Sequence, residues 1–281
     1  MLNKIRSLIN QYALLAAFAV YLLFDFLLLG VGRLLSLLPD TLPMEYLKEV
    51  VLILIPAAFP FIFGFSRVFK TKNFFRGLLC ILPFFVLQFF WLAIFFVNNV
   101  GNPEVNWQPW YMIVYGVVCV VGIGIREECF YRATVQNIIA KKYANSVKGI
   151  WITVIFGAII FGLCHVSNLF FGMDPLSVFT QVVYAILIGI LFGAVYLRSG
   201  NIWVLILVHA LTDLAGLAES TFLQSISDVE EMNRLSFSWG ALLFRLFYVL
   251  LAIFLLRPSK CREIYESFCF AEEKSETATR T

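Results

Sequence analysis

The stretch from Leu176 to Leu197 reads LSVFTQVVYAILIGILFGAVYL and contains no charged side chain. A helix crosses the hydrocarbon core of a bilayer with about 20 apolar residues. The stretch is apolar throughout rather than alternating, so it does not resemble a strand of a membrane barrel. Backbone surrounded by lipid must satisfy its own hydrogen bonds, which a helix does. We therefore predict a transmembrane helix here.

Seven further runs of the same kind occur along the chain: Tyr12–Leu29, Val50–Phe69, Leu78–Val97, Trp110–Ile125, Ile150–His165, Ile202–Leu217 and Ala241–Leu256. Of all residues, 61% are hydrophobic and 14% are charged, against about 45–50% and about 25% in soluble domains. This composition excludes a soluble enzyme, a disordered chain and a nucleic-acid-binding protein. The expected fold is an all-α polytopic transmembrane bundle of about eight spans.

Lysines and arginines predict the orientation of these spans. With the N-terminus in the cytoplasm, 17 of the 21 basic residues fall in cytoplasmic segments. Only Arg33, Lys48 and Arg234 fall in outer segments, and Arg245 falls within a span. Cytoplasmic loops of membrane proteins carry an excess of Lys and Arg. We expect a multi-pass protein of the cell membrane with both termini in the cytoplasm.

A single domain is expected. Residues 1–270 should form one membrane-embedded helical domain, and the residues that carry motifs lie in its core at 120–217. The polar segment 271–281, AEEKSETATRT, is expected to be a disordered cytoplasmic tail.

Ionisable side chains inside the apolar runs need an explanation, because each costs about 2.5–3.5 kcal/mol at the bilayer centre on translocon scales. The candidates are Asp25, Glu127, Glu128, Arg132, His165, His209, Asp213 and Arg245. The chain has only two histidines, and both lie in predicted spans. The pairs Glu128/Arg132 and His209/Asp213 have i,i+4 spacing, which places their members on one helix face. For Asp25 and Arg245 we hypothesise a buried pair between the first and last helices.

Depth in the membrane groups the central candidates. Counted from the nearest cytoplasmic Lys or Arg, Glu128, His165 and His209 lie roughly 20, 25 and 17 Å along their helices, at about 1.5 Å per residue. These similar depths require the fourth helix to continue past Ile125, through the glutamates, to about Lys141. Phe161, one turn before His165, is expected to form part of the wall of the site.

Three short motifs in this region resemble a known family. Glu127 to Arg132 reads EECFYR, which fits EExxxR; Phe161 to His165 reads FGLCH, which fits FxxxH; His209 to Asp213 reads HALTD, which fits HxxxD. In this order on consecutive membrane segments, they resemble the CAAX protease and bacteriocin-processing family, which includes the type II CAAX prenyl endopeptidases. The resemblance covers roughly residues 120–216.

The resemblance implies a role for each matching residue. Glu127 corresponds to the general base that activates a water, and Glu128 and Arg132 to its supporting pair. His165 corresponds to a histidine that helps to hold the water, and His209 to one that stabilises the oxyanion. Asp213 stands where the eukaryotic-type proteases have Asn. An ionised Asp only accepts hydrogen bonds, so Asp213 either is protonated or orients His209 and favours its charged form.

Three functions remain open at this point. The first is glutamate-dependent hydrolysis of a peptide bond in a hydrated cavity, without a cofactor. The second is a zinc-dependent protease, because two His and one Glu form several catalytic zinc sites, although HExxH is absent. The third is a non-catalytic membrane protein, such as a bacteriocin immunity factor or a transporter. A protease would act on a peptide or protein, lipidated or not, in contact with membrane lipids.

Overall fold

The computed structural model describes residues 8–264, and within this range the chain is helical with no strand. The long helices are α2 (Ala13–Leu35), α3 (Leu42–Ile62), α4 (Phe74–Asn99), α5 (Trp110–Glu127), α7 (Val147–Leu163), α8 (Pro175–Ser199), α9 (Ile202–Gly216) and α12 (Trp239–Leu255). The shorter elements are η1 (Ser66–Phe69), η2 (Glu128–Gln136), α6 (Asn137–Tyr143), η3 (Cys164–Phe171), α10 (Ala218–Phe222) and α11 (Asp228–Asn233). The predicted all-α fold is confirmed.

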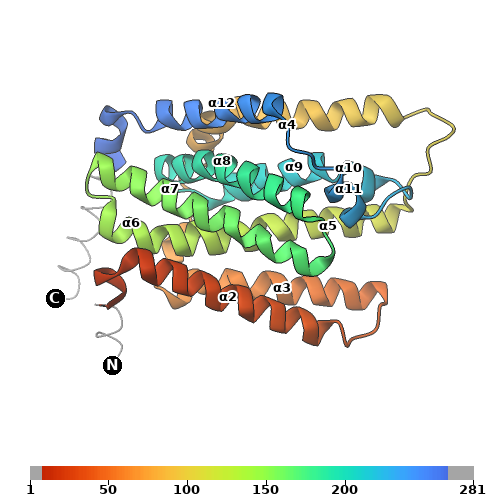
Figure 1. Ribbon diagram of the computed structural model, residues 1–281, viewed down its shortest axis with the longest axis horizontal. Coiled ribbons are helices and arrows are strands. Elements are labelled where there is room, and N and C mark those ends of the chain that lie inside the picture. The colour runs from red at the N-terminus through yellow and green to blue at the C-terminus, as the bar shows by residue number, and fades with distance from the viewer. Residues whose placement is uncertain (1–7, 265–281) are drawn as a thin grey trace.

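Each predicted span overlaps one of the long helices, and consecutive long helices run back and forth through the bundle (Figure 1). By length and composition, four helices between residues 8 and 264 suffice to cross a membrane, or five if Trp239–Leu255 and the bent continuation Pro258–Ile264 count as one span. The expected number of about eight is therefore approximate. Two of the other predicted spans depart from a simple spanning helix: α9 has only 15 residues, and α3 begins with charged side chains. The chain is an integral membrane protein.

The bundle has two chemically different ends. At the first, Lys142 donates to the carbonyl of Gln11, and Arg198 pairs with Glu263 at 3.0 Å. At the second, the amide of Gln224 donates to the carbonyl of Trp107 at 2.7 Å. We call the first the basic end and the second the acidic end, after the charged residues that gather at each. α2 starts and α12 finishes toward the basic end, whereas α10 and α11 lie at the acidic end (Figure 1).

Side-chain caps begin several of the helices that form the core. Ser146 accepts a hydrogen bond from the backbone N–H of Gly149 and caps α7, and Asn201 caps α9 by accepting from Val204. Asp174 caps α8 by accepting from two backbone N–H groups, with Pro175 as the first helical residue. These residues satisfy N–H groups that have no partner within the helix. The caps fix where α7, α8 and α9 begin, and hence the register of the side chains that follow.

Close helix contacts hold the centre of the bundle together. A Cβ atom at Gly124 of α5 would lie 3.0 Å from the carbonyl oxygen of Ile206 and 3.3 Å from the amide nitrogen of Ala210, both in α9. Small residues of this kind let membrane helices approach each other closely. Gly124 lies three residues, about one turn, before Glu127 in α5. On the facing helix α9, the contacted Ala210 directly follows His209. The spacing of these two functional candidates therefore depends on Gly124.

Gly124→Val should separate α5 from α9, because the added atoms meet backbone rather than a side chain that can move. Overpacking typically destabilises a protein by about 1–3 kcal/mol. We expect a lower melting temperature of the purified protein in detergent, measured by intrinsic fluorescence. Gly30→Val is the matched control, since a Cβ at Gly30 has no neighbour within 4 Å. Equal melting temperatures for the two variants would contradict the close approach.

Candidate active site

The helix that carries the glutamates continues well past the end of the predicted span. α5, the π-helical segment η2 and α6 follow one another without a break in helical backbone, so one helical segment runs from Trp110 to Tyr143. The expected continuation to about Lys141 is confirmed, and the simple boundary at Ile125 is wrong. Every residue from 128 to 140 is buried. π-helical turns are rare and occur frequently at functional sites.

Glu128 and Arg132 form the predicted ion pair on this segment, with Arg132 Nη1 3.3 Å from Glu128 Oε1. Both side chains are almost completely buried, at 0% and 2% exposure. The guanidinium lies 3.9 Å from the centre of the Phe161 ring and 5.5 Å from that of Phe192. Such stacking stabilises a desolvated cation. Arg132 is therefore held between aromatic rings and a carboxylate in the centre of the bundle.

His209 of α9 has carboxylates at both ring nitrogens. Its Nδ1 donates to Glu128 Oε1 at 2.7 Å. Its Nε2 lies 3.6 Å from Glu127 Oε2 and 3.5 Å from Asp213 Oδ2. These last two oxygens are buried, and between residues 8 and 264 neither has a hydrogen-bond partner. Buried polar atoms are nearly always paired with protein or water, so the two oxygens are suited to bind a polar group that enters the site.

His165 stands at the start of η3, directly after the end of α7. Its Nδ1 lies 3.1 Å from the carbonyl oxygen of Phe161, which fits donation from the ring to the backbone. That bond leaves Nε2 for other partners. The Phe161 ring contacts both histidines edge-on, with ring centroids 5.5 Å from His165 and 5.9 Å from His209. The expectation that Phe161 forms part of the wall is confirmed.

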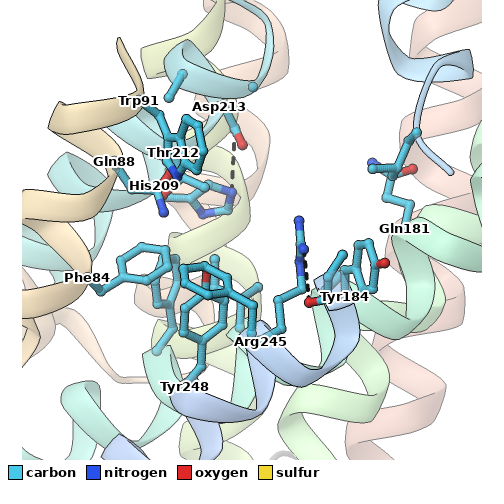
Figure 2. A pocket seen from close by; sticks show the side chains of 18 of the residues that line it. Phe84, Gln88, Trp91, Gln181, Tyr184, His209, Thr212, Asp213, Arg245 and Tyr248 are labelled. Carbon is cyan, nitrogen blue, oxygen red and sulfur yellow. Dashed lines mark hydrogen bonds and ion pairs between the residues drawn. The ribbon is translucent and has the colours of Figure 1, made fainter. Parts of the chain in front are cut away.

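Two cavities meet at these residues. The smaller one, of about 250 Å³, we call the polar chamber; its lining includes Asp25, Arg126, Glu127, Tyr131, His165, Asn168, Gln181, His209 and Asp213. The larger one, of about 540 Å³, we call the apolar cavity; its lining includes Phe84, Trp91, Phe161, Tyr184, Phe192, Phe244 and Tyr248 (Figure 2). Four residues line both: His165, Gln181, His209 and Asp213. The polar residues thus stand between a chamber that suits water and a cavity that suits a larger apolar ligand.

All six residues singled out in the sequence lie in this region. Glu127, His165, His209 and Asp213 line the polar chamber. Glu128 and Arg132 lie behind His209, buried away from both cavities. The six side chains come from three segments that are far apart in the sequence, namely the α5–η2 segment, the start of η3 and α9.

Two further residues of the region, Arg126 and Gln181, are not among the site residues predicted from the sequence. The predicted span ends at Ile125, which places Arg126 among the cytoplasmic cations, but Arg126 lines the polar chamber. Its guanidinium lies 3.3 Å from the carboxylate of Glu49 in α3. Gln181 was not considered, although it lines both cavities and accepts a hydrogen bond from Asn168 at 2.8 Å. The signal for Gln181 in the sequence is its polar amide within the apolar run Leu176–Leu197.

The hypothesised pair between Asp25 and Arg245 is wrong. Asp25 of α2 lines the polar chamber, whereas Arg245 of α12 lines the apolar cavity. The guanidinium of Arg245 lies 3.8 Å from the centre of the Tyr184 ring and donates to the carbonyl of Ala241 (Figure 2). α2 and α12 lie on opposite sides of the bundle (Figure 1). Each of the two charges therefore faces its own cavity.

The zinc-dependent alternative needs a cluster of ligating side chains. Within residues 8–264, no group of three or more His, Cys, Asp or Glu side chains is placed to hold a metal ion. Nδ1 of His165 and Nδ1 of His209 are engaged, with a backbone carbonyl and with Glu128, which leaves Nε2 of each ring for other partners.

Comparison with known proteins gives one family. Residues 107–215 match the family model described as type II CAAX prenyl endopeptidase Rce1-like. No curated protein and no solved structure matches the chain. The matched segment contains all three motifs, from Glu127 to Asp213. Residues 107–215 are therefore similar to the Rce1-like type II CAAX prenyl endopeptidases, and this match supports the resemblance of the motif-bearing segment to the CAAX protease and bacteriocin-processing family.

Proposed function

We propose that the chain is an intramembrane endopeptidase that hydrolyses a peptide bond with a water activated by Glu127. The observation that carries this proposal is the polar chamber, in which the carboxylate of Glu127 and the imidazoles of His165 and His209 face one cavity. A carboxylate in such a place is a suitable general base toward water. The unpaired Oε2 of Glu127 is the atom that we propose accepts the proton.

The reaction proceeds in two steps in this proposal. Glu127 removes a proton from water while the water oxygen attacks the carbonyl carbon of the scissile bond, and His165 holds that water. The carbonyl oxygen becomes an oxyanion. The C–N bond then breaks, and the proton held by Glu127 passes to the nitrogen of the leaving amine. The products are a new carboxylate and a new amine.

His209 stabilises the oxyanion through Nε2. Because Nδ1 already donates to Glu128, donation from Nε2 as well requires the doubly protonated ring. Carboxylates lie at both nitrogens, within 3.6 Å, and opposite charges favour the charged form. One such donor is worth about 2.7–4 kcal/mol in soluble proteases. We therefore propose that Asp213 orients His209 and stabilises its charge rather than donating a hydrogen bond itself.

Glu128 and Arg132 act as positioning residues in this scheme, since neither lines a cavity. Glu128 fixes the ring of His209, and Arg132 compensates the charge of Glu128. The apolar cavity holds the residues of the substrate that flank the scissile bond. Its aromatic lining suits a hydrophobic peptide segment or an attached lipid. The proposed location is the cell membrane, with both termini in the cytoplasm.

The experiment that tests this function compares membrane peptides from cells that contain the protein with those from cells that lack it. Mass spectrometry should find at least one peptide that is intact only in the cells that lack the protein and that occurs as two fragments in the others. Identical peptide populations in the two kinds of cell, with normal amounts of the protein, would contradict an endopeptidase.

Asp213→Asn distinguishes the two roles considered for Asp213. If Asp213 stabilises the charge on His209, the neutral amide should lower the cleavage rate at least about tenfold, which corresponds to about 1.4 kcal/mol in the barrier. If Asp213 instead donated a hydrogen bond as a neutral acid, the amide would maintain or raise the rate. The rate is measured on the peptide found in the comparison above, at equal protein concentration. Asp228→Asn, on the exposed surface of α11, is the control for an identical chemical change.

A further inference from the structure

Charge differs sharply between the two ends of the bundle. Among residues 8–264, the basic end holds 11 cations and one anion, Glu263, giving +10; the cations are Arg67, Lys70, Lys72, Arg76, Lys141, Lys142, Lys148, Arg198, Arg257, Lys260 and Arg262. The acidic end holds eight anions and three cations, giving −5; the anions are Asp40, Glu45, Glu104, Asp174, Glu219, Asp228, Glu230 and Glu231. Membrane proteins place the Lys- and Arg-rich end in the cytoplasm. The acidic end is thus the extracytoplasmic one.

Both cavities reach toward the acidic end. The polar chamber is lined there by Ser167 and Asn168, which follow the end of α7, and by Met232 of α11. The apolar cavity is lined there by Gly216, the last residue of α9, and by Leu235, which precedes α12. All five residues are at least partly exposed. The cavities therefore have their mouths among the short elements that join the helices at the acidic end.

Toward the basic end, buried residues close the site. Phe130 and Ile139 of the helical segment after Glu127 have 0% exposure, as do Leu205 of α9 and Phe192 of α8. Neither cavity is lined by a residue from the loops at the basic end. Among the described residues, the packed layer between the two histidines and the basic end thus leaves no mouth at the basic end.

We propose that the catalytic chamber opens to the extracytoplasmic side of the membrane and takes its peptide from there. This inference rests on the proposed function, and it names the class of substrate: a peptide segment presented at the extracytoplasmic surface or lying in the outer half of the bilayer. Water reaches Glu127 from the same side, and the cleaved fragments leave there. A peptide segment confined to the cytoplasm would have to cross the packed layer below the histidines.

Thiol labelling in intact cells tests the sidedness. Single cysteines are introduced at Met232 in the mouth of the polar chamber, at Asn102 on the acidic end and at Lys72 on the basic end; the last two are exposed. The cells are treated with a membrane-impermeant maleimide before or after permeabilisation. Labelling of the chain with its native cysteines is subtracted. We expect Met232→Cys and Asn102→Cys to be labelled in intact cells and Lys72→Cys to be labelled only after permeabilisation.

Two results would overturn the proposal. Labelling of Lys72→Cys but not Asn102→Cys in intact cells would mean that the basic end faces outward. Labelling of Asn102→Cys without any labelling of Met232→Cys, even after permeabilisation, would mean that the chamber has no mouth at this end. Both readouts report geometry alone, so they do not depend on whether the chain hydrolyses peptides.

A second measurement links the mouth to the substrate. Intact Met232→Cys cells are treated with the impermeant maleimide, and untreated cells of the same variant are the reference. Treatment should raise the amount of the uncleaved peptide at least about tenfold. Unchanged cleavage in fully labelled cells would overturn entry through this mouth while leaving the proposed hydrolysis intact. Loss of cleavage in the Glu127→Gln variant tests the hydrolysis separately.

Discussion

Glu127→Gln should abolish peptide cleavage. The amide preserves the shape of the side chain but has no basic oxygen to take a proton from water. General-base catalysis typically contributes a factor of about 10²–10⁴, so residual cleavage should fall below about 1% of the wild-type rate. The measurement follows the amount of the uncleaved peptide in membranes by mass spectrometry. The amount of the protein itself should not change, because the carboxylate oxygen Oε2 of Glu127 has no hydrogen-bond partner within residues 8–264.

The matched control is Glu104→Gln, which makes the same chemical change on an exposed loop at the acidic end. It should leave cleavage unchanged. If the biological effect of the protein survived Glu127→Gln at normal protein levels, the chain would act by binding rather than by hydrolysis. The non-catalytic alternative considered from the sequence would then be preferred.

Arg132→Met should destabilise the folded protein by about 3–5 kcal/mol, the usual cost of removing one partner from a buried ion pair. Methionine fills the space between Phe161 and Phe192 but leaves the carboxylate of Glu128 buried without its cation. Glu128 would then lose its charge or draw in water, and the ring of His209 would lose its anchor. We expect a large fall in melting temperature and little protein in the membrane.

Arg67→Met provides the comparison, because Arg67 is exposed at the basic end. Its melting temperature should lie close to that of the wild type. The double variant Arg132→Met with Glu128→Gln should recover part of the lost stability, since it removes the uncompensated charge. If Arg132→Met alone were as stable as the wild type, the buried pair would have no structural role.

The sequence predicts the helical architecture well, because a long apolar run in lipid satisfies its backbone hydrogen bonds within one segment only as a helix. It also predicts pairs within one helix, such as Glu128 with Arg132, since helix geometry alone sets their distance. Pairs between helices are different. Depth along a helix follows from residue number, but the direction in which a side chain faces depends on how helices pack. Depth alone therefore predicts a pair between Asp25 and Arg245, although α2 and α12 lie on opposite sides of the bundle (Figure 1).

The wrong placement of Arg126 has a related reason. The sequence predicts the end of a span there, because an apolar run stops and Lys or Arg often marks that boundary. In the structure the helix continues through the π-helical segment, and Arg126 pairs with Glu49 inside the bundle. A charge that compensates another charge on a neighbouring helix cannot be told from a surface charge by looking at one segment alone. The two cavities likewise arise from the packing of several helices, so no single segment of the sequence predicts them.

The measurement that most directly tests a water activated by Glu127 is peptide cleavage in H₂¹⁸O, with protein purified in detergent and the substrate peptide identified from membranes. Mass spectrometry of the N-terminal fragment should show one ¹⁸O atom in its new carboxylate for each bond cleaved by the wild type, and no such fragment with Glu127→Gln. A labelled fragment formed by Glu127→Gln at the wild-type rate would contradict the role of Glu127.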